Sequence, residues 1–460
     1  MASSLVRKPT TLQCLLPHHF LHKLHFSSSQ NIINQVMAAM LQDAPLRIPI
    51  PTPTTTSSPW TVGNVCGILQ SVPRFFFQST RSIGRQKGFR HRAPSKQRHL
   101  RTETEDCHKG TRILDPSSHR NPAKVELGLD KALQFYYWVE SQSGFSHCES
   151  TCREMALVLA KAHKFRSLWA FLREMAQKGE WNLVTTATIT CVIKILGEEG
   201  LVNEALSAFY RMKQFHCKAD VYAYNTVICA LCRVGYFKKA RFMLEQMELP
   251  GFRCPPDVYT YTIFITFYCK SSLQTGCRKA IRRRLWEANR LFRAMIFKGF
   301  VPDVVTYNCL IDCCCKTYRI GRALELFNDM PKRGCVPNRV TYNSFIRYYS
   351  VVNEIDKAIE MMRRMRTMNH GVPTSSSYTP IIHALCEAAR VREARDFLVE
   401  LVEQGSIPRE YTYKLVCTTL SSEGESGLSD ELQGRIKYGI ERRCRELKKV
   451  KPVMTNNIEL

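Results

Sequence analysis

Apolar residues recur at a helical spacing over most of the chain, in segments that come in pairs. Within residues 304–338, apolar side chains follow the spacing i, i+3, i+4, i+7 from Tyr307 to Cys314, and again from Ile320 to Met330. This spacing gathers apolar side chains on one face of a helix. The pattern therefore predicts two short amphipathic helices in this stretch.

Residues that interrupt helices mark the ends of each segment. The polar residues 316–319 separate the two segments, Gly334 follows the second one, and Pro337 prevents its continuation. Glycine holds the same place in other copies of the pattern: Gly179, Gly251, Gly299 and Gly405. Each pair of segments is thus predicted to form a helical hairpin.

Three ladders of like residues show that the hairpin is repeated. One ladder is made of tyrosines: Tyr224, Tyr261, Tyr307, Tyr342, Tyr378 and Tyr413. The second is made of alanines: Ala205, Ala240, Ala288, Ala323, Ala358 and Ala394. The third is Met212, Met247, Met295, Met330, Met365 and Leu401. The alanine and methionine ladders advance by the same steps, of 35, 48, 35, 35 and 36 residues, so we interpret them as one repeat of about 35 residues.

The ladders divide the chain into units and flanks. The predicted units are 149–185, 186–220, 221–257, 258–303, 304–338, 339–374 and 375–409. Residues 131–147 have the pattern of a second helix, for which residues 60–71 are the suggested first helix; we assign 102–148 to a linker and partial repeat. Residues 410–460 are assigned to a partial repeat and a basic C-terminal helix.

A hairpin of this size cannot bury its apolar face alone, so successive hairpins must stack. We therefore predict an all-α fold, a right-handed superhelical solenoid of helix-turn-helix repeats with a concave groove. No apolar run approaches the ~18–20 residues of a membrane span, and we expect a monomer without membrane insertion.

These motifs resemble the pentatricopeptide repeat (PPR) family of organelle proteins over residues 149–409. The resemblance rests on Tyr-Asn in the first helix, Cys-Lys at its end, Glu-Ala-Leu in the second helix and Gly-x-x-Pro-Asp at the close. Tetratricopeptide repeats have a similar length, but their Trp-x-x-Leu-Gly pattern is missing here. The uniform repeat length is similar to that of the P subfamily.

The net charge of +26 favours a polyanionic partner, but it is unevenly distributed. Residues 1–101 contain 13 basic residues and one acid, and residues 102–460 contain 53 basic and 39 acidic residues. A basic leader rich in serine and poor in acids is typical of organelle import. We predict a targeting leader with a basic disordered segment at 1–101, directed to the mitochondrion with the plastid as the alternative. A plain basic tail, or nuclear targeting by residues 85–101, stays open.

The resemblance also implies which residues read RNA. In the family, the fifth and last residues of a unit together read one base, and the second residue packs against base faces. The pairs that match these positions are Thr190/Asp220, Asn225/Asp257, Thr262/Asp303, Asn308/Asn338, Asn343/Thr374 and Thr379/Arg409. The family's code implies G-U-G-(C/U), 5′ to 3′, for residues 186–338. The last two pairs depart from the common combinations.

Two plainer explanations compete with these assignments. Asp or Asn before a helix is a good N-cap, so these residues could serve folding alone. Three basic residues close first helices and are candidates for backbone phosphate contacts: Arg233, Lys270 and Lys316. Cations at the end of a helix are also favoured by its dipole.

The 11-residue expansion after Lys270 is rich in arginine and is expected to lengthen the second helix backward. A backbone clamp, a protein partner and a solvated surface are its alternative roles.

Candidate chemistry is weak. The cysteines at the twelfth position of units alternate with Ala160, Gly197 and Ser350, which indicates a packing slot rather than a metal site. His147-Cys148-Glu149 fits half of a zinc-deaminase motif, but Pro-Cys-x-x-Cys is missing. We predict no catalytic residue, no metal and no cofactor.

Together these features predict a protein that binds single-stranded RNA selectively and acts on organelle transcripts, in processing, stability, splicing or translation. Other RNA-processing proteins of the organelle are further partners that this hypothesis allows. The alternative hypothesis is a helical-repeat scaffold that holds a protein partner.

Overall fold

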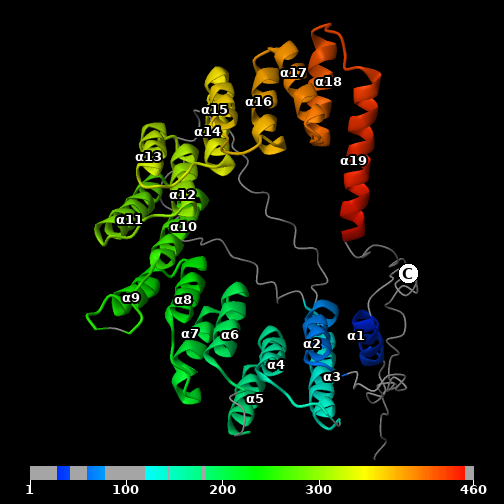
Figure 1. The fold of residues 1–460 in the computed structure, drawn as a ribbon, viewed down its shortest axis with the longest axis vertical. Coiled ribbons are helices and arrows are strands. Elements are labelled where there is room, and N and C mark those ends of the chain that lie inside the picture. The colour runs from blue at the N-terminus through cyan, green and yellow to red at the C-terminus, as the bar shows by residue number, and fades with distance from the viewer. Residues whose placement is uncertain are drawn as a thin grey trace, which may run out of the picture. The chain divides into compact units, whose positions relative to one another are not determined.

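The repeated helical pattern of the sequence appears in the structure as a succession of helices, and the described residues contain no β-strand (Figure 1). The computed structural model describes residues 28–41, 60–77, 120–142, 144–178, 183–251 and 253–450. The prediction of an all-α fold is confirmed. None of the described helices combines the length and apolar character needed to cross a bilayer.

The described helices form two compact units, each larger than a single repeat. The first compact unit runs to Pro256, and the second compact unit begins at Asp257. The first unit contains α1 (Ser28–Met40), α2 (Val62–Phe76), α3 (Pro122–Glu140), α4 (Glu149–Lys161), α5 (Phe165–Gln177), α6 (Thr186–Glu198), α7 (Val202–Arg211), the 3₁₀ turn η4 (Met212–Phe215), α8 (Val221–Arg233) and α9 (Phe237–Met247).

The second unit contains α10 (Val258–Gln274), α11 (Arg278–Phe297), α12 (Val304–Lys316), α13 (Ile320–Lys332), α14 (Arg339–Val351), α15 (Ile355–Thr367), α16 (Ser375–Glu387), α17 (Val391–Glu403), α18 (Glu410–Ser422) and α19 (Asp430–Val450).

Both compact units are built from two layers of helices. A first helix packs against its own second helix and against the first helix of the next hairpin, as α12 does with α13 and α14. The first helices α10, α12, α14, α16 and α18 therefore form one layer of the second unit, and α2, α4, α6 and α8 form the equivalent layer of the first unit.

The residue ladders form the core between the layers. All six ladder alanines have no exposed surface, which lets two helices approach closely. The methionine ladder is at most 1% exposed at every position, and burying one such side chain contributes about 1.5–3 kcal/mol. Gly334 ends α13 with φ of +75°, a left-handed conformation that glycine adopts without a steric penalty.

The first helices start at side-chain caps. Asp220 and Asp303 accept a hydrogen bond from the backbone amide of the third residue of the next helix, at Ala223 (2.7 Å) and Thr306 (2.7 Å). Such a cap stabilises a helix by about 1 kcal/mol. α8 begins at Val221 and α12 at Val304 for this reason.

An additional hairpin precedes the seven predicted units. α2 packs against α3 and α4, and a Cβ on Gly128 of α3 would lie 2.5 Å from the Phe76 side chain of α2. The Trp60 ring contacts Phe135 and Trp138 edge-on, with centroids 6.0 and 5.2 Å apart. α2 thus lies within the interval that we assigned to the leader, at the segment suggested as the first helix of a further repeat. Most of the remaining leader lies outside the described residues.

The expansion after Lys270 is divided between two helices, whereas the sequence led us to expect growth of the second helix only. α10 has 17 residues and α11 has 20, against 13 in each of α12 and α13. The last turn of α10 is held in place because Ser272, fully buried, donates to Cys269 O at 2.7 Å. Arg284 of α11 donates to Ser271 O at 2.6 Å, so the two extensions support each other.

Candidate nucleic-acid interface

Three of the pairs, all in the second compact unit, are linked by hydrogen bonds near the N-terminal ends of neighbouring first helices. In the second unit, Asn308 of α12 donates through Nδ2 to Oδ1 of Asn338, the N-cap of α14, at 3.3 Å. Thr341 completes the group because its hydroxyl donates to Asn308 Oδ1 at 2.6 Å. Asn308 is half-buried and Asn338 is exposed, so the two amides are joined and still reach solvent.

The Thr262/Asp303 pair is joined indirectly, through Thr306. The Thr306 hydroxyl donates to Asp303 Oδ1 at 2.6 Å, and its oxygen lies 2.6 Å from the Thr262 hydroxyl. Thr262 is only 4% exposed, and its hydroxyl also lies 3.0 Å from Val258 O. The exposed carboxylate of Asp303 is therefore the more accessible member of this pair.

The Asn343/Thr374 pair is joined through Ser376 and Ser377. Asn343 donates to Ser376 Oγ at 3.0 Å and accepts from Ser377 Oγ at 2.7 Å, while Ser376 Oγ lies 3.0 Å from the Thr374 hydroxyl. Asn343 is buried.

Two further pairs lie in or begin in the first compact unit. Thr190 is buried and donates to Thr186 O at 2.7 Å, while Asp220 caps α8. Asn225 is buried in the first unit, and Asp257 caps α10 in the second, accepting from the Thr260 amide at 2.8 Å. The sequence did not indicate that Thr190, Asn225 and Thr262 would be covered to this extent.

Sequence reasoning missed the residues at the third position, three of which, Thr306, Thr341 and Ser377, link pairs. They are fully or almost fully buried Ser or Thr side chains: Thr188, Thr260, Thr306, Thr341, Ser377 and Thr412. They recur with the same period as the tyrosines, so a search for hydroxyl residues at a fixed position would have found them. Ala223 breaks the row, so the Thr190/Asp220 pair has no hydroxyl at this position.

A row of exposed apolar side chains accompanies the pairs at the second position of the units. Its members are between 52% and 69% exposed: Tyr222, Tyr259, Val305, Val340 and Tyr411. Their recurrence at one position of successive repeats makes these side chains candidates for a contact surface. Their place, three residues before the fifth position, puts them on the same end of each first helix.

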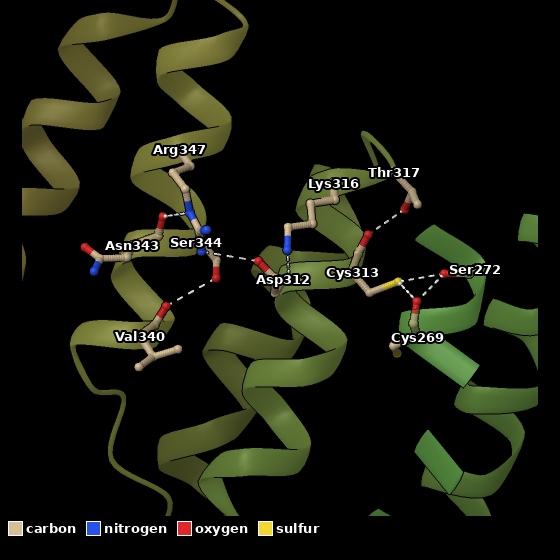
Figure 2. Close-up of polar contacts among 10 residues, drawn as sticks. All are labelled: Cys269, Ser272, Asp312, Cys313, Lys316, Thr317, Val340, Asn343, Ser344 and Arg347. Carbon is tan, nitrogen blue, oxygen red and sulfur yellow. Dashed lines mark hydrogen bonds and ion pairs between the residues drawn. The ribbon is translucent and has the colours of Figure 1, made fainter. Parts of the chain in front are cut away.

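The three candidate phosphate-binding residues differ in how they are held. Arg233 and Lys270 are exposed, and the Lys270 ammonium lies 5.3 Å from the centre of the Phe267 ring. Lys316 is instead paired with Asp312, Nζ to Oδ2 at 2.5 Å (Figure 2). Arg347 of α14 binds the other Asp312 oxygen at 3.3 Å and thereby ties α12 to α14. The i, i+4 spacing of Asp312 and Lys316 made this pair predictable from the sequence.

Among the described cysteines, all but the exposed Cys444 are buried or half-buried. Cys313 lies 3.1 Å from Ser272 Oγ, between α12 and α10 (Figure 2). Burial raises the pKa of Cys314 to about 12, so this thiol stays protonated at neutral pH. A Cβ on Gly197, at the twelfth position of its unit, would lie 2.5 Å from Ala230 Cβ, in agreement with a close-packing slot. The described residues contain no group of metal-ligating side chains.

His147, from the partial deaminase motif, is a buried structural residue. Its ring stacks on Tyr136 with centroids 3.7 Å apart, and its two nitrogens lie 3.0 Å from Tyr136 O and 3.1 Å from the Thr151 hydroxyl. Burial lowers the pKa of His147, which keeps the ring neutral. This histidine anchors the start of α4.

Family models match most of the repeated region. Models described as "PPR repeat family" and "PPR repeat" match residues 184–233, 219–270, 282–316, 302–347, 333–366 and 376–406. A pentatricopeptide repeat-containing protein of Arabidopsis thaliana is 61% identical over 425 residues, which cover 92% of this chain and 93% of that protein. A second Arabidopsis relative, named as mitochondrial, is 33% identical over 25% of this chain and 20% of its own length.

Solved structures with a similar arrangement include the pentatricopeptide repeat protein PPR10 in complex with an 18-nt psaJ RNA element. Its TM-score is 0.36 at 21% identity, over 72% of this chain and 57% of that one. Yeast Rmd9p in complex with a 16-nt target RNA has a TM-score of 0.40 at 11% identity, over 73% and 67% of the two chains. The matched repeat models and the 61% identity over nearly the whole length establish that this chain belongs to the pentatricopeptide repeat family.

Proposed function

We propose that this protein binds single-stranded RNA selectively and acts on organelle transcripts, in their processing, stability, splicing or translation. The joined amides of Asn308 and Asn338, 3.3 Å apart and open to solvent, carry the proposal. An amide both donates and accepts hydrogen bonds, as the Watson–Crick edge of a pyrimidine requires. Asn338 fixes the orientation of the Asn308 amide: its Oδ1 accepts from the backbone amides of Val340 and Thr341 and can only accept, so Asn308 must face it with its NH2 group.

The exposed second-position residues supply the other half of a base site. A base placed between Val305 and Val340 would contact an apolar side chain on each face while its edge meets the two amides. Tyr222, Tyr259 and Tyr411 offer rings at the equivalent places, and stacking on an aromatic ring is worth ~1–3 kcal/mol per base. This arrangement accepts one base for each unit.

The pairs give the proposal a sequence. Thr190/Asp220, Asn225/Asp257, Thr262/Asp303 and Asn308/Asn338 correspond to G, U, G and C or U, read 5′ to 3′. The buried Asn343/Thr374 pair has both amide atoms occupied by serines, so we assign it weak selectivity. Arg233 and Lys270 contact phosphates in this account, and Lys316 does so only in competition with Asp312.

We assign this binding to the monomer, with no metal or cofactor and no catalytic step. A protein-interaction scaffold, which would use the same exposed row for a peptide, is the competing outcome of the test below.

The test is direct binding by the full chain. Four unstructured RNAs would carry G-U-G-N, with each base in turn at N, and fluorescence anisotropy would give their dissociation constants. We expect C and U to bind more tightly than A and G, since one good base contact is worth ~1–3 kcal/mol. Equal dissociation constants for the four bases would refute selectivity, and no RNA binding at all would favour the scaffold.

The organelle is the mitochondrion in this proposal, with the plastid as the alternative. The basic leader supports import, and the names of two Arabidopsis relatives include "mitochondrial". Because α2 packs within the array, the import signal should precede it. Residues 1–59 fused to a fluorescent protein should reach mitochondria in plant cells, and a reporter that stays in the cytosol would contradict the assignment.

A further inference from the structure

The surface of α11 that faces away from α10 is a continuous basic and aromatic stripe. The buried residues of α11, Leu285, Ala288, Leu291, Phe292 and Met295, occupy its other side. The residues of the stripe follow each other at intervals of three or four, and all are exposed: Lys279, Arg283, Trp286, Arg290, Arg293 and Phe297. We call this surface the α11 stripe. It is about 30 Å long, from the rise of a 20-residue helix.

The charge of α11 sets it apart from the other second helices. α11 contains seven basic residues and one acid, Glu287. The equivalent helix α13 has as many acids as bases, and α17 has twice as many acids as bases. Mixed charge is the usual condition of a solvated helix surface, so solvation alone does not account for α11.

This arrangement works against the stability of the helix. The first two turns hold four exposed cations, among them Arg278 with Arg282 and Lys279 with Arg283 at the repulsive spacing i, i+4. They lie at the positive end of the helix dipole, where acids are favoured and α11 has none in its first turn. No ion pair joins these four residues to any other described residue. An anionic partner would relieve both effects.

The aromatic residues indicate which anion fits. The Trp286 ring is 60% exposed, and the Arg290 guanidinium lies 6.0 Å from its centre. Arginine recognises phosphate with two parallel hydrogen bonds, and an exposed indole between arginines can stack on an unpaired base. A membrane-binding helix would instead gather its apolar residues on one face, whereas Trp286 and Phe297 alternate with charges along the stripe.

We propose that the α11 stripe binds the sugar-phosphate backbone of single-stranded RNA that flanks the segment read by the pairs. The proposal rests on the proposed function for the flanked RNA, but it assigns a surface that the pairs do not use. The Arg284–Ser271 bond keeps the extended turns of the two helices together, so the stripe has a fixed position relative to α10.

The test compares two RNAs on the full chain. One holds only the G-U-G-C core, and the other holds the same core with unstructured flanks long enough to follow α11. The test variant is Arg283→Gln with Arg293→Gln. The matched control, Lys238→Gln with Arg363→Gln, removes two exposed charges from the second helices α9 and α15. Trp286→Ala separates stacking from charge.

We expect the test variant to lose affinity for the flanked RNA by about tenfold at physiological salt, with the slope of log K against log salt reduced by about 1.4. Affinity for the core RNA should stay unchanged, as should both affinities in the control. Trp286→Ala should weaken binding of the flanked RNA without changing the salt slope.

Equal losses in the test variant and the control would overturn the proposal. The proposal would also be overturned if the test variant kept its affinity for the flanked RNA. It would likewise be overturned if the test variant lost binding to vesicles of phosphatidylserine and phosphatidylcholine while its RNA binding stayed intact. A core RNA that shows no base preference in the wild type would instead contradict the proposed reading of bases. The stripe would survive that result if flanked binding still depended on Arg283 and Arg293.

Discussion

The Asn308/Asn338 and Thr190/Asp220 pairs occupy the same positions of their repeats but are constructed differently. Asn308 and Asn338 are joined directly, and the Thr341 hydroxyl donates to Asn308 Oδ1. Thr190 donates to its own helix, and the Asp220 side chain accepts from the Ala223 backbone amide. The unit after Thr190 has Ala223 at the third position, where the unit after Asn308 has Thr341.

The difference teaches that the third residue decides whether a pair is held as one group. An N-cap needs only a backbone amide, which every residue except proline supplies, so Asp220 caps α8 without a hydroxyl neighbour. A hydroxyl at the third position can accept from the backbone amide of the cap residue and donate to a side chain of the preceding repeat. Thr341 accepts from the Asn338 backbone amide and donates to Asn308 Oδ1 in this way. Capping and pairing are therefore separable properties of the same residues.

Removing the linking hydroxyl should have the largest effect. Thr341→Val keeps the shape of the side chain but removes the hydroxyl that Asn308 Oδ1 and the Asn338 backbone amide bond to. We expect a loss of about 1–3 kcal/mol in the free energy of unfolding, measured by urea denaturation, together with weaker preference for C and U. Thr418→Val, an exposed residue that bonds only within α18, is the control. A stability equal to that of the control would show that the link is dispensable.

The two lysines should separate charge from base recognition. Lys270→Gln should weaken binding to every RNA about fourfold at physiological salt and lower the salt slope by about 0.7. Lys316→Gln should have a smaller effect, because Asp312 already neutralises that ammonium at 2.5 Å. Binding isotherms over a series of salt concentrations would measure both. Equal effects, or an effect that depends on the base, would contradict this assignment.

Adding the missing hydroxyl should have the smallest effect. Ala223→Thr supplies Asp220 with a hydroxyl neighbour like the one that Asp303 has in Thr306. We expect the free energy of unfolding to rise by about 0.5–1 kcal/mol, and the preference for G at the first base to sharpen. Urea denaturation and the four-base comparison at that position test both. A loss of stability would mean that α6 leaves no room beside the fully buried Ala223.

The sequence was sufficient for the elements and insufficient for their contacts. The ladders predicted an all-α protein, and helices begin at Val221 and Val304 because Asp220 and Asp303 cap them. Local spacing carries such features.

The burial of Thr190 and Thr262, and the link through Thr306, depend on how closely neighbouring hairpins approach, which no local pattern records. The division of the expansion between α10 and α11 likewise depends on the contact between Arg284 and Ser271.

The central claim is that each unit reads its own base through its pair. Asn308→Thr with Asn338→Asp would give this unit the pair of Thr262 and Asp303, with Thr341 already in place of Thr306. Selection from a random RNA pool, with the wild type and the double variant side by side, measures the result. We predict that the preferred base at this one position changes from C or U to G, while neighbouring positions keep their preferences. Enrichment of the same motif by both proteins would contradict the account.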